Sequence, residues 1–198
     1  MTGWTVAGVL ALGAFHGVNP AMGWLFATSI GLQERSRRAL ALALPPIAAG
    51  HLASVALAVL LVDGLRDVVP NGAMRVGGAA GLAVFAVWRF TAAHPHPRWV
   101  GMRLRPHELA LWSFLMSTAH GAGLMLLPFA VRVHGHGLHG SAGLVAAHTL
   151  AMIAVAGACA LVVYEVVGVG VLRRGWLNLD RVWVYALGAG AAATLFLA

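Results

Sequence analysis

Runs of about 20 apolar residues, separated by short polar segments, constrain the fold of this chain more than any other feature, because a helix of that length crosses a hydrocarbon layer of about 30 Å. The chain has 60% hydrophobic and 10% charged residues. This composition excludes a disordered chain, a collagen and a disulfide-rich secreted module. We predict an all-α polytopic membrane protein with six transmembrane helices. The runs are Trp4–Leu32, Ala39–Val62, Met74–Ala92, Glu108–Val133, Ser141–Val171 and Leu177–Ala198.

The first run has no basic start and is longer than the apolar core of a signal peptide, so we expect it to be retained. Ten of the thirteen arginines lie in or beside the segments after the first, third and fifth runs. The positive-inside rule then places these segments in the cytoplasm and both termini outside, in a bacterial cytoplasmic (inner) membrane. The alternative is five spans with a re-entrant third run, which would put the C-terminus inside.

The formal charge of +7 does not indicate nucleic-acid binding. That function needs basic residues on one water-facing surface, whereas here the arginines punctuate apolar runs. We expect the lipid bilayer as a partner and no nucleic acid.

The two halves of the chain contain matching histidine segments. FHGVNP around His16 in the first run resembles AHG around His120 in the fourth, and GHL around His51 in the second resembles AHT around His148 in the fifth. Chance matching of Ala, Gly and Leu is the alternative to duplication. Since each unit has three spans, a duplicated second unit must be inverted. The resulting divisions are a first three-helix repeat, a cytoplasmic connector and a second three-helix repeat, at 1–92, 93–107 and 108–198.

Four histidines, His16, His51, His120 and His148, fall inside the apolar runs. An ionisable side chain in hydrocarbon is costly and usually faces a bundle interior or a wet cavity. Burial favours the neutral imidazole, whose lone pair suits Ni, Co, Cu or Zn cations. We predict that these four form a metal site at mid-depth around a shared polar cavity. Hydrogen bonding between helices is the alternative.

Residues that interrupt helices follow two of these histidines. Pro20 removes a backbone donor and frees carbonyls near His16, which Asn19 can bond again. Gly121, Gly123 and Pro128 follow His120. These interruptions indicate either a cation site or a simple packing kink.

Other residues near the runs allow two readings each. Met22, Met116 and Met125 lie near the histidines and are either thioether ligands, which would favour Cu(I), or core residues. Glu165 is either a proton-coupling carboxylate or a helix-end residue paired with Arg173 or Arg174.

A second histidine cluster, His134, His136 and His139, lies within six residues between the fourth and fifth runs. Short His-rich tracts commonly bind metals, and the expected topology places this loop outside, where it would collect or receive a cation. A solvated loop without a ligand is the alternative. Three more histidines, His94, His96 and His107, lie in the connector.

Two inverted three-span units, each with a distinctive residue beside Gly and Pro in its first span, resemble the lysine-exporter superfamily. It includes nickel/cobalt exporters, urease-accessory membrane proteins, sulfite and sulfonate exporters, and the thiol transporters of cytochrome c biogenesis. His16 and His120 stand where the thiol transporters have Pro and Cys. The single cysteine, Cys159, lies elsewhere, so the resemblance does not imply disulfide exchange.

The nickel/cobalt branch resembles the chain better, because it has a first-span histidine near a proline and a His-rich loop. Asn19 and Met22 occupy the neighbourhood in which that branch has a second histidine and an acid. The resemblance implies export of a transition-metal cation.

The sequence therefore predicts a secondary transporter of a transition-metal ion. One alternative is a membrane haem protein in which His51 and His148 ligate haem b. Others are an anion exporter or an accessory subunit of a larger membrane complex. The expected partners besides lipid are a metal ion and either further copies of this chain, in a homo-oligomer, or a larger membrane complex. We expect no enzyme, since the His-Glu-x-x-His, Gly-x-Ser-x-Gly and Gly-Lys phosphate motifs are missing from the sequence.

Overall fold

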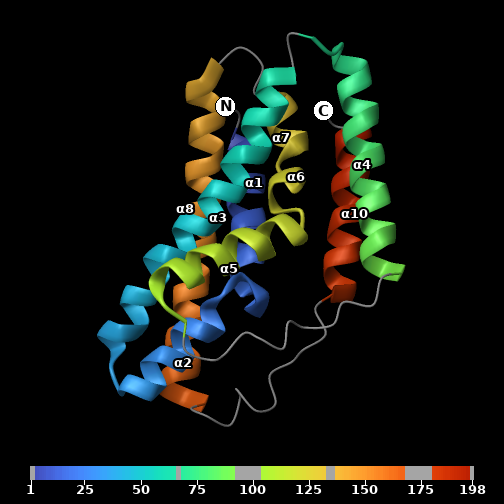
Figure 1. The fold of residues 1–198 in the computed structure, drawn as a ribbon. Coiled ribbons are helices and arrows are strands. Elements are labelled where there is room, and N and C mark those ends of the chain that lie inside the picture. Colours follow the sequence, from blue (N-terminus) through green and yellow to red (C-terminus); the bar gives the residue numbers. More distant parts are fainter. Residues whose placement is uncertain (1–2, 66–67, 92–103, 133–136, 168–179, 197–198) are drawn as a thin grey trace.

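The computed structural model describes residues 3–65, 68–91, 104–132, 137–167 and 180–196 (Figure 1). Nearly all of these residues are helical, and no strand occurs within the ranges just given, which confirms the predicted all-α class. In chain order the elements are α1 (Gly3–Val18), η1 (Pro20–Met22), α2 (Trp24–Glu34), α3 (Arg37–Leu65), α4 (Asn71–Thr91), α5 (Pro106–Ala119), α6 (Ala122–Met125), α7 (Leu127–Arg132), α8 (Gly137–Val162), η2 (Val163–Val167) and α10 (Asp180–Phe196).

Each predicted apolar run coincides with a helix or with an interrupted helix. The second, third and sixth runs are the single helices α3, α4 and α10, and the fifth is α8 continued by the π-helical turn η2. The first run is divided into α1, η1 and α2, and the fourth into α5, α6 and α7.

The break in the first run lies directly after His16. α1 ends at Val18, and the amide of Asn19 donates to the His16 carbonyl at 3.1 Å. The side chain of Asn19 caps the next turn by accepting from the amide of Ala21 at 2.9 Å. Pro20 has no amide hydrogen to continue the helix. The predicted interruption is confirmed, and a capped turn re-forms the local hydrogen bonds.

The break in the fourth run lies at His120, the residue that caps the end of α5. Gly121 follows with a φ of 68°, in the left-handed region that glycine adopts without strain. The short helices α6 and α7 then continue the chain. Both interruptions that the sequence predicts beside first-span histidines are therefore present.

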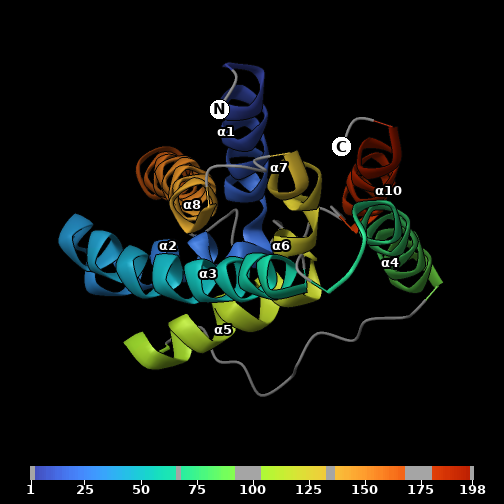
Figure 2. The ribbon, with the colours of Figure 1, turned by 90° about the horizontal axis from the view of Figure 1, so that it is seen from above.

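The helices pack in pairs. α1 lies along α8, α5 lies along α3, and α3 and α8 also contact each other. α4 and α10 stand together at one side of the molecule (Figures 1 and 2). α6 and α7 fill the space between this pair and the other helices (Figure 2).

Close approach of α1 to α8 depends on Gly13 and Gly17, which have the four-residue spacing that favours tight helix packing in membranes. A Cβ at Gly13 would collide with the His148 carbonyl and lie 2.9 Å from Ala151 Cβ. A Cβ at Gly17 would collide with the Met152 carbonyl. The two helix backbones are therefore in direct contact.

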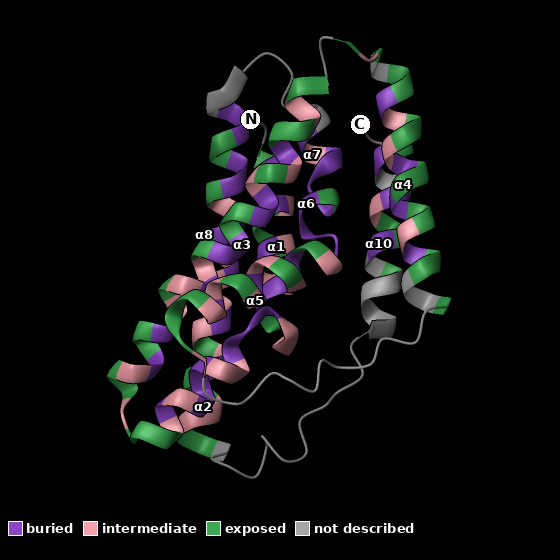
Figure 3. Ribbon diagram, viewed as in Figure 1, coloured by how far each residue is buried: buried purple, intermediate pink, exposed green. Residues whose placement is uncertain are grey.

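Two stretches of the described chain are long and apolar enough to cross a membrane: Arg37–Leu65 and Gly140–Val166. The 29 residues of α3 correspond to about 44 Å, against about 30 Å of hydrocarbon. Leu60, Val84 and Leu150, on α3, α4 and α8, are 57%, 69% and 67% exposed, and Figure 3 shows exposed residues along the outer faces of these helices. Extensive apolar surface of this kind is typical of membrane association.

Candidate functional site

Three histidine rings from three different helices meet in the interior. His16 of α1, His51 of α3 and His148 of α8 are each 0% exposed. Their ring centroids are 5.8 Å apart for His16 and His51, 5.0 Å for His16 and His148, and 5.3 Å for His51 and His148. We call these residues the histidine triad. It combines two residues of the first predicted repeat with one of the second.

Local sequence explains how three helices approach closely enough for these rings to touch. Gly13 lies against the backbone of α8 at His148, which brings α1 and α8 together. Gly50 precedes His51 and lies against the Ala110 carbonyl, which brings α3 and α5 together. Gly13 thus accounts for the approach of His16 to His148, and Gly50 accounts for the approach of His51 to α5.

Two of the three rings, those of His16 and His51, are oriented by a hydrogen bond on one nitrogen. His16 Nδ1 donates to the Leu12 carbonyl at 2.9 Å. His51 Nδ1 lies 2.8 Å from Ser117 Oγ of α5. The Val9 carbonyl lies near the His148 ring, although neither nitrogen of that ring makes a hydrogen bond of normal geometry within the described residues.

The fourth predicted ligand, His120, lies beside the triad at the end of α5. It is 5% exposed, and its Nδ1 donates to the Met116 carbonyl at 2.7 Å. It lies three residues after Ser117, whose hydroxyl contacts His51. The sequence therefore located all four histidines in the interior, and the structure brings three of the rings into mutual contact.

Sequence reasoning missed the polar residues that line α5. Ser113 Oγ donates to the Ile47 carbonyl at 2.8 Å, and one turn later Ser117 Oγ meets His51. Ser54 Oγ and Thr118 Oγ1 are hydrogen-bonded to each other at 2.9 Å. We call these three contacts the α3–α5 seam. Hydroxyl residues spaced by four in an apolar run were the available signal.

The predicted methionines occupy different environments. Met22 is fully buried in η1, with its sulfur 3.8 Å from Ser117 Oγ. Met125 packs among core residues with Leu82 and Leu187. Of these, Met22 is connected to the triad, through Ser117.

A cavity of about 380 Å³ lies beside α1, α7 and α10. Its lining is apolar and includes Leu12, Phe15, Met125 and Phe129. The Phe15 ring meets that of His16 edge-on, with centroids 6.3 Å apart. The sequence predicts a polar cavity shared by the histidines, whereas this cavity approaches the triad through apolar side chains.

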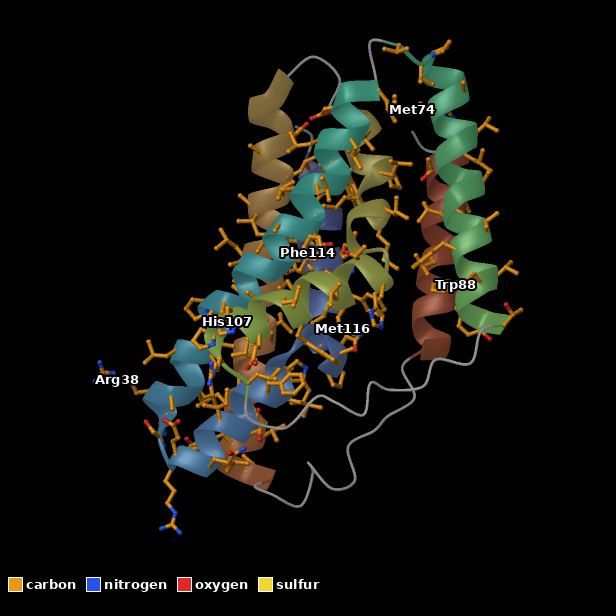
Figure 4. The ribbon with its side chains drawn as sticks, in the orientation of Figure 1. Arg38, Met74, Trp88, His107, Phe114 and Met116 are labelled. Atoms are coloured by element: carbon orange, nitrogen blue, oxygen red, sulfur yellow. The ribbon has the colours of Figure 1, made fainter. Side chains whose placement is uncertain are left out.

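The His-rich loop stays a prediction. His134 and His136 lie outside the described residues, and His139 falls in the first turn of α8. In the connector, His94 and His96 are also outside them, whereas His107 is exposed in the first turn of α5 (Figure 4).

Glu165 has a partner that the sequence did not suggest. It lies in η2 and forms a two-point ion pair with Arg37 at the start of α3, with N–O distances of 2.5 and 3.0 Å. The sequence pairs it with Arg173 or Arg174, which lie outside the described residues. The observed pair fixes the end of α8 against the start of α3 and accounts for Glu165 as a helix-end residue.

Nothing in the described part of the chain forms a ready-made metal cage of three or more His, Cys, Asp or Glu side chains. The triad rings are arranged face to face and edge to face, so the rings would have to rotate for their lone pairs to share one cation. Comparison of the chain with models of protein families, with curated proteins and with solved structures finds no match.

Proposed function

We propose that this chain is a six-span inner-membrane protein, built from two inverted three-helix repeats, and that it is a secondary transporter of a transition-metal cation through the histidine triad. The observation that carries the proposal is the meeting of three fully buried imidazoles from three helices beside two helix breaks. Sites of this kind, at interrupted helices near mid-depth, are typical of transporters with inverted repeats.

The pairing of helices supports the inverted repeat. Exchanging the two halves replaces α1 by α5, α3 by α8 and α4 by α10. The contact of α1 with α8 then becomes the contact of α5 with α3, and both are present. The contacts of α3 with α8 and of α4 with α10 map onto themselves, and both are also present.

The ends of the molecule support an even number of spans with both termini outside. Figure 1 places the N- and C-terminal ends at the same end of the bundle. Arg38 lies at the opposite end and points away from the protein (Figure 4). Arg37 and Arg38, at the start of α3, therefore lie at the end opposite the termini, which agrees with a cytoplasmic face there under the positive-inside rule.

The hydrogen-bonding state of the triad supports a cation as the ligand. Within the described residues, His51 Nε2 is buried without a hydrogen-bond partner, and neither ring nitrogen of His148 makes a hydrogen bond of normal geometry. Buried polar atoms are nearly always paired in native proteins, so unpaired ones indicate a ligand, an ion or a water. Imidazole nitrogens suit Ni, Co, Cu and Zn. The transported cation would therefore be a transition metal.

A small cation fits this arrangement better than haem b. The His51 and His148 rings are stacked, with an interplanar angle of 20° and centroids 5.3 Å apart. Axial ligation instead needs two imidazoles that point their nitrogens at the iron from opposite faces of the macrocycle. Stacked rings at this spacing leave no room for the macrocycle between them.

Metal accumulation in cells tests the proposal. Cells expressing the wild-type chain are compared with cells carrying His51→Gln, His148→Gln or the control His107→Ala, which replaces an exposed histidine outside the triad. We expect wild type and His107→Ala to change the cell content of Ni, Co, Cu or Zn relative to an empty vector, and the triad variants to lose that change. Immunoblots of membranes check that all variants are present in equal amounts. Unchanged contents of all four metals would contradict the proposal, as would triad variants that behave like the wild type.

A further inference from the structure

We propose that Ser117 is a positioning residue that holds His51 in the tautomer with hydrogen on Nδ1, so that the lone pair of Nε2 belongs to the triad. The purpose of this arrangement rests on the proposed function, since a cation would bind that lone pair. The tautomer itself is a property of the chain without ligand.

The argument begins with the single hydrogen of the Ser117 hydroxyl. Ser117 Oγ lies 2.8 Å from His51 Nδ1 and 3.8 Å from Met22 Sδ. A thioether sulfur only accepts hydrogen bonds, and weakly. A hydrogen bond between Ser117 and Met22 therefore uses the serine hydrogen, and the serine oxygen is left to accept from His51 Nδ1.

The opposite arrangement is less favourable. If the serine hydrogen pointed at His51 Nδ1, the ring would carry its hydrogen on Nε2, which has no partner within the described residues. A buried N–H donor would then be unsatisfied, and Met22 Sδ would lose its donor. The first arrangement makes two hydrogen bonds and leaves the lone pair of His51 Nε2 without a donor. The second makes one hydrogen bond and leaves the N–H of His51 Nε2 without an acceptor, which is the more costly state.

None of the three groups is exposed at the protein surface, so bulk solvent does not satisfy either tautomer. His51, Ser117 and Met22 are each 0% exposed. They come from α3, α5 and η1. The two contacts of Ser117, with His51 and with Met22, therefore connect the triad to the break in the first span. A residue of the second predicted repeat thereby orients a ligand of the first.

The same helix provides a matched control. Ser113 lies one turn before Ser117, is also 0% exposed, and donates to the Ile47 carbonyl at 2.8 Å. Ser113→Ala removes a buried hydroxyl from the same interface without touching an imidazole. Ser117→Thr keeps a hydroxyl at the original position. Met22→Leu removes the sulfur acceptor while nearly conserving volume.

The test is nitrogen NMR on the purified, metal-free, full-length protein labelled with ¹⁵N-histidine, which distinguishes protonated from unprotonated ring nitrogens. Resonances missing from a His51→Gln sample identify His51. We expect wild type, Ser113→Ala and Ser117→Thr to show His51 with a protonated Nδ1 and an unprotonated Nε2. Ser117→Ala should lose this preference and give a mixture, and Met22→Leu should shift His51 towards the Nε2–H form.

Metal affinity is a second measurement that tests the role of Ser117. For whichever of Ni²⁺, Co²⁺, Cu²⁺ and Zn²⁺ the wild type binds in competition with a chelating dye, Ser117→Ala should weaken binding about 10- to 100-fold, as is typical when a residue that orients a ligand is removed. Ser113→Ala and Ser117→Thr should bind like the wild type.

The outcomes separate the two proposals. An Nε2–H tautomer in wild-type protein would overturn the role of Ser117 and leave the transport proposal standing. So would the same tautomer preference in Ser117→Ala as in wild type. A protein that shows the expected tautomers but neither binds nor moves any of the four metals would overturn the proposed function and leave the positioning role of Ser117 established.

Discussion

Replacing Gly13 with alanine should separate α1 from α8 and weaken the fold. The added Cβ would collide with the His148 carbonyl and lie 2.9 Å from Ala151 Cβ, whereas ordinary contact begins at 3.4 Å. The backbone carbonyl cannot rotate away, so the helices must move apart by at least about 0.5 Å. Overpacking of this kind costs about 1–3 kcal/mol. Alanine also improves helix propensity by about 1 kcal/mol, so the net loss of stability is about 0–2 kcal/mol.

The same substitution at Gly143 of α8 provides the control. Nothing lies within 4 Å of a Cβ built there, so Gly143→Ala should gain up to about 1 kcal/mol from helix propensity alone. The two variants differ in packing but not in chemistry. The expected difference between them is the overpacking term, about 1–3 kcal/mol.

Thermal unfolding of the purified protein in detergent measures this difference. For a domain of this size, 1 kcal/mol corresponds to roughly 2–4 °C in the unfolding midpoint. We expect the midpoint of Gly143→Ala to be at or above that of the wild type and the midpoint of Gly13→Ala to be the lowest of the three. Gly13→Ala should also lose the metal accumulation of the wild type, because His16 and His148 are held 5.0 Å apart by this contact. A Gly13→Ala protein as stable as Gly143→Ala, with normal accumulation, would refute the close packing of α1 on α8.

Two further predictions concern the surface. Arg37→Gln should leave the unfolding midpoint nearly unchanged. The side chains of Arg37 and Glu165 are 73% and 36% exposed, so solvent screens their ion pair. A fall in the midpoint as large as that of Gly13→Ala would contradict this prediction. In vesicles that contain brominated lipids, Trp88→Phe should reduce the quenched fraction of tryptophan fluorescence, because Trp88 of α4 is 50% exposed. An unchanged quenched fraction would show that Trp88 does not meet lipid.

The helices and their interruptions could be predicted because their causes are local. Run length determines which segments can form long helices, and Pro20 and Gly121 end a helix through their own backbone properties. The interior position of His16, His51 and His148 also follows from the cost of placing an imidazole in hydrocarbon. These inferences need no knowledge of which helix packs against which.

The neighbours of the histidines could not be predicted, because they depend on how each helix is rotated about its axis. α1 and α8 are apolar nearly all round, so the sequence indicates no polar face from which to read their rotation. On α5, Ser113 and Ser117 mark one face, but the sequence does not indicate which helix that face meets. The contact of Ser117 with His51 therefore emerged only from the fold. The ion pair of Arg37 with Glu165 joins residues 128 positions apart, and no local pattern indicates it.

The α3–α5 seam makes the two halves of the chain dependent on each other. His51 and Ser54 come from the first predicted repeat, and they meet Ser117 and Thr118 from the second. Without the second half, the hydroxyl of Ser54 and the imidazole of His51 would lose these partners on α5. Because both halves belong to one chain, they are always present in equal number, and a hydroxyl of the second half can orient an imidazole of the first.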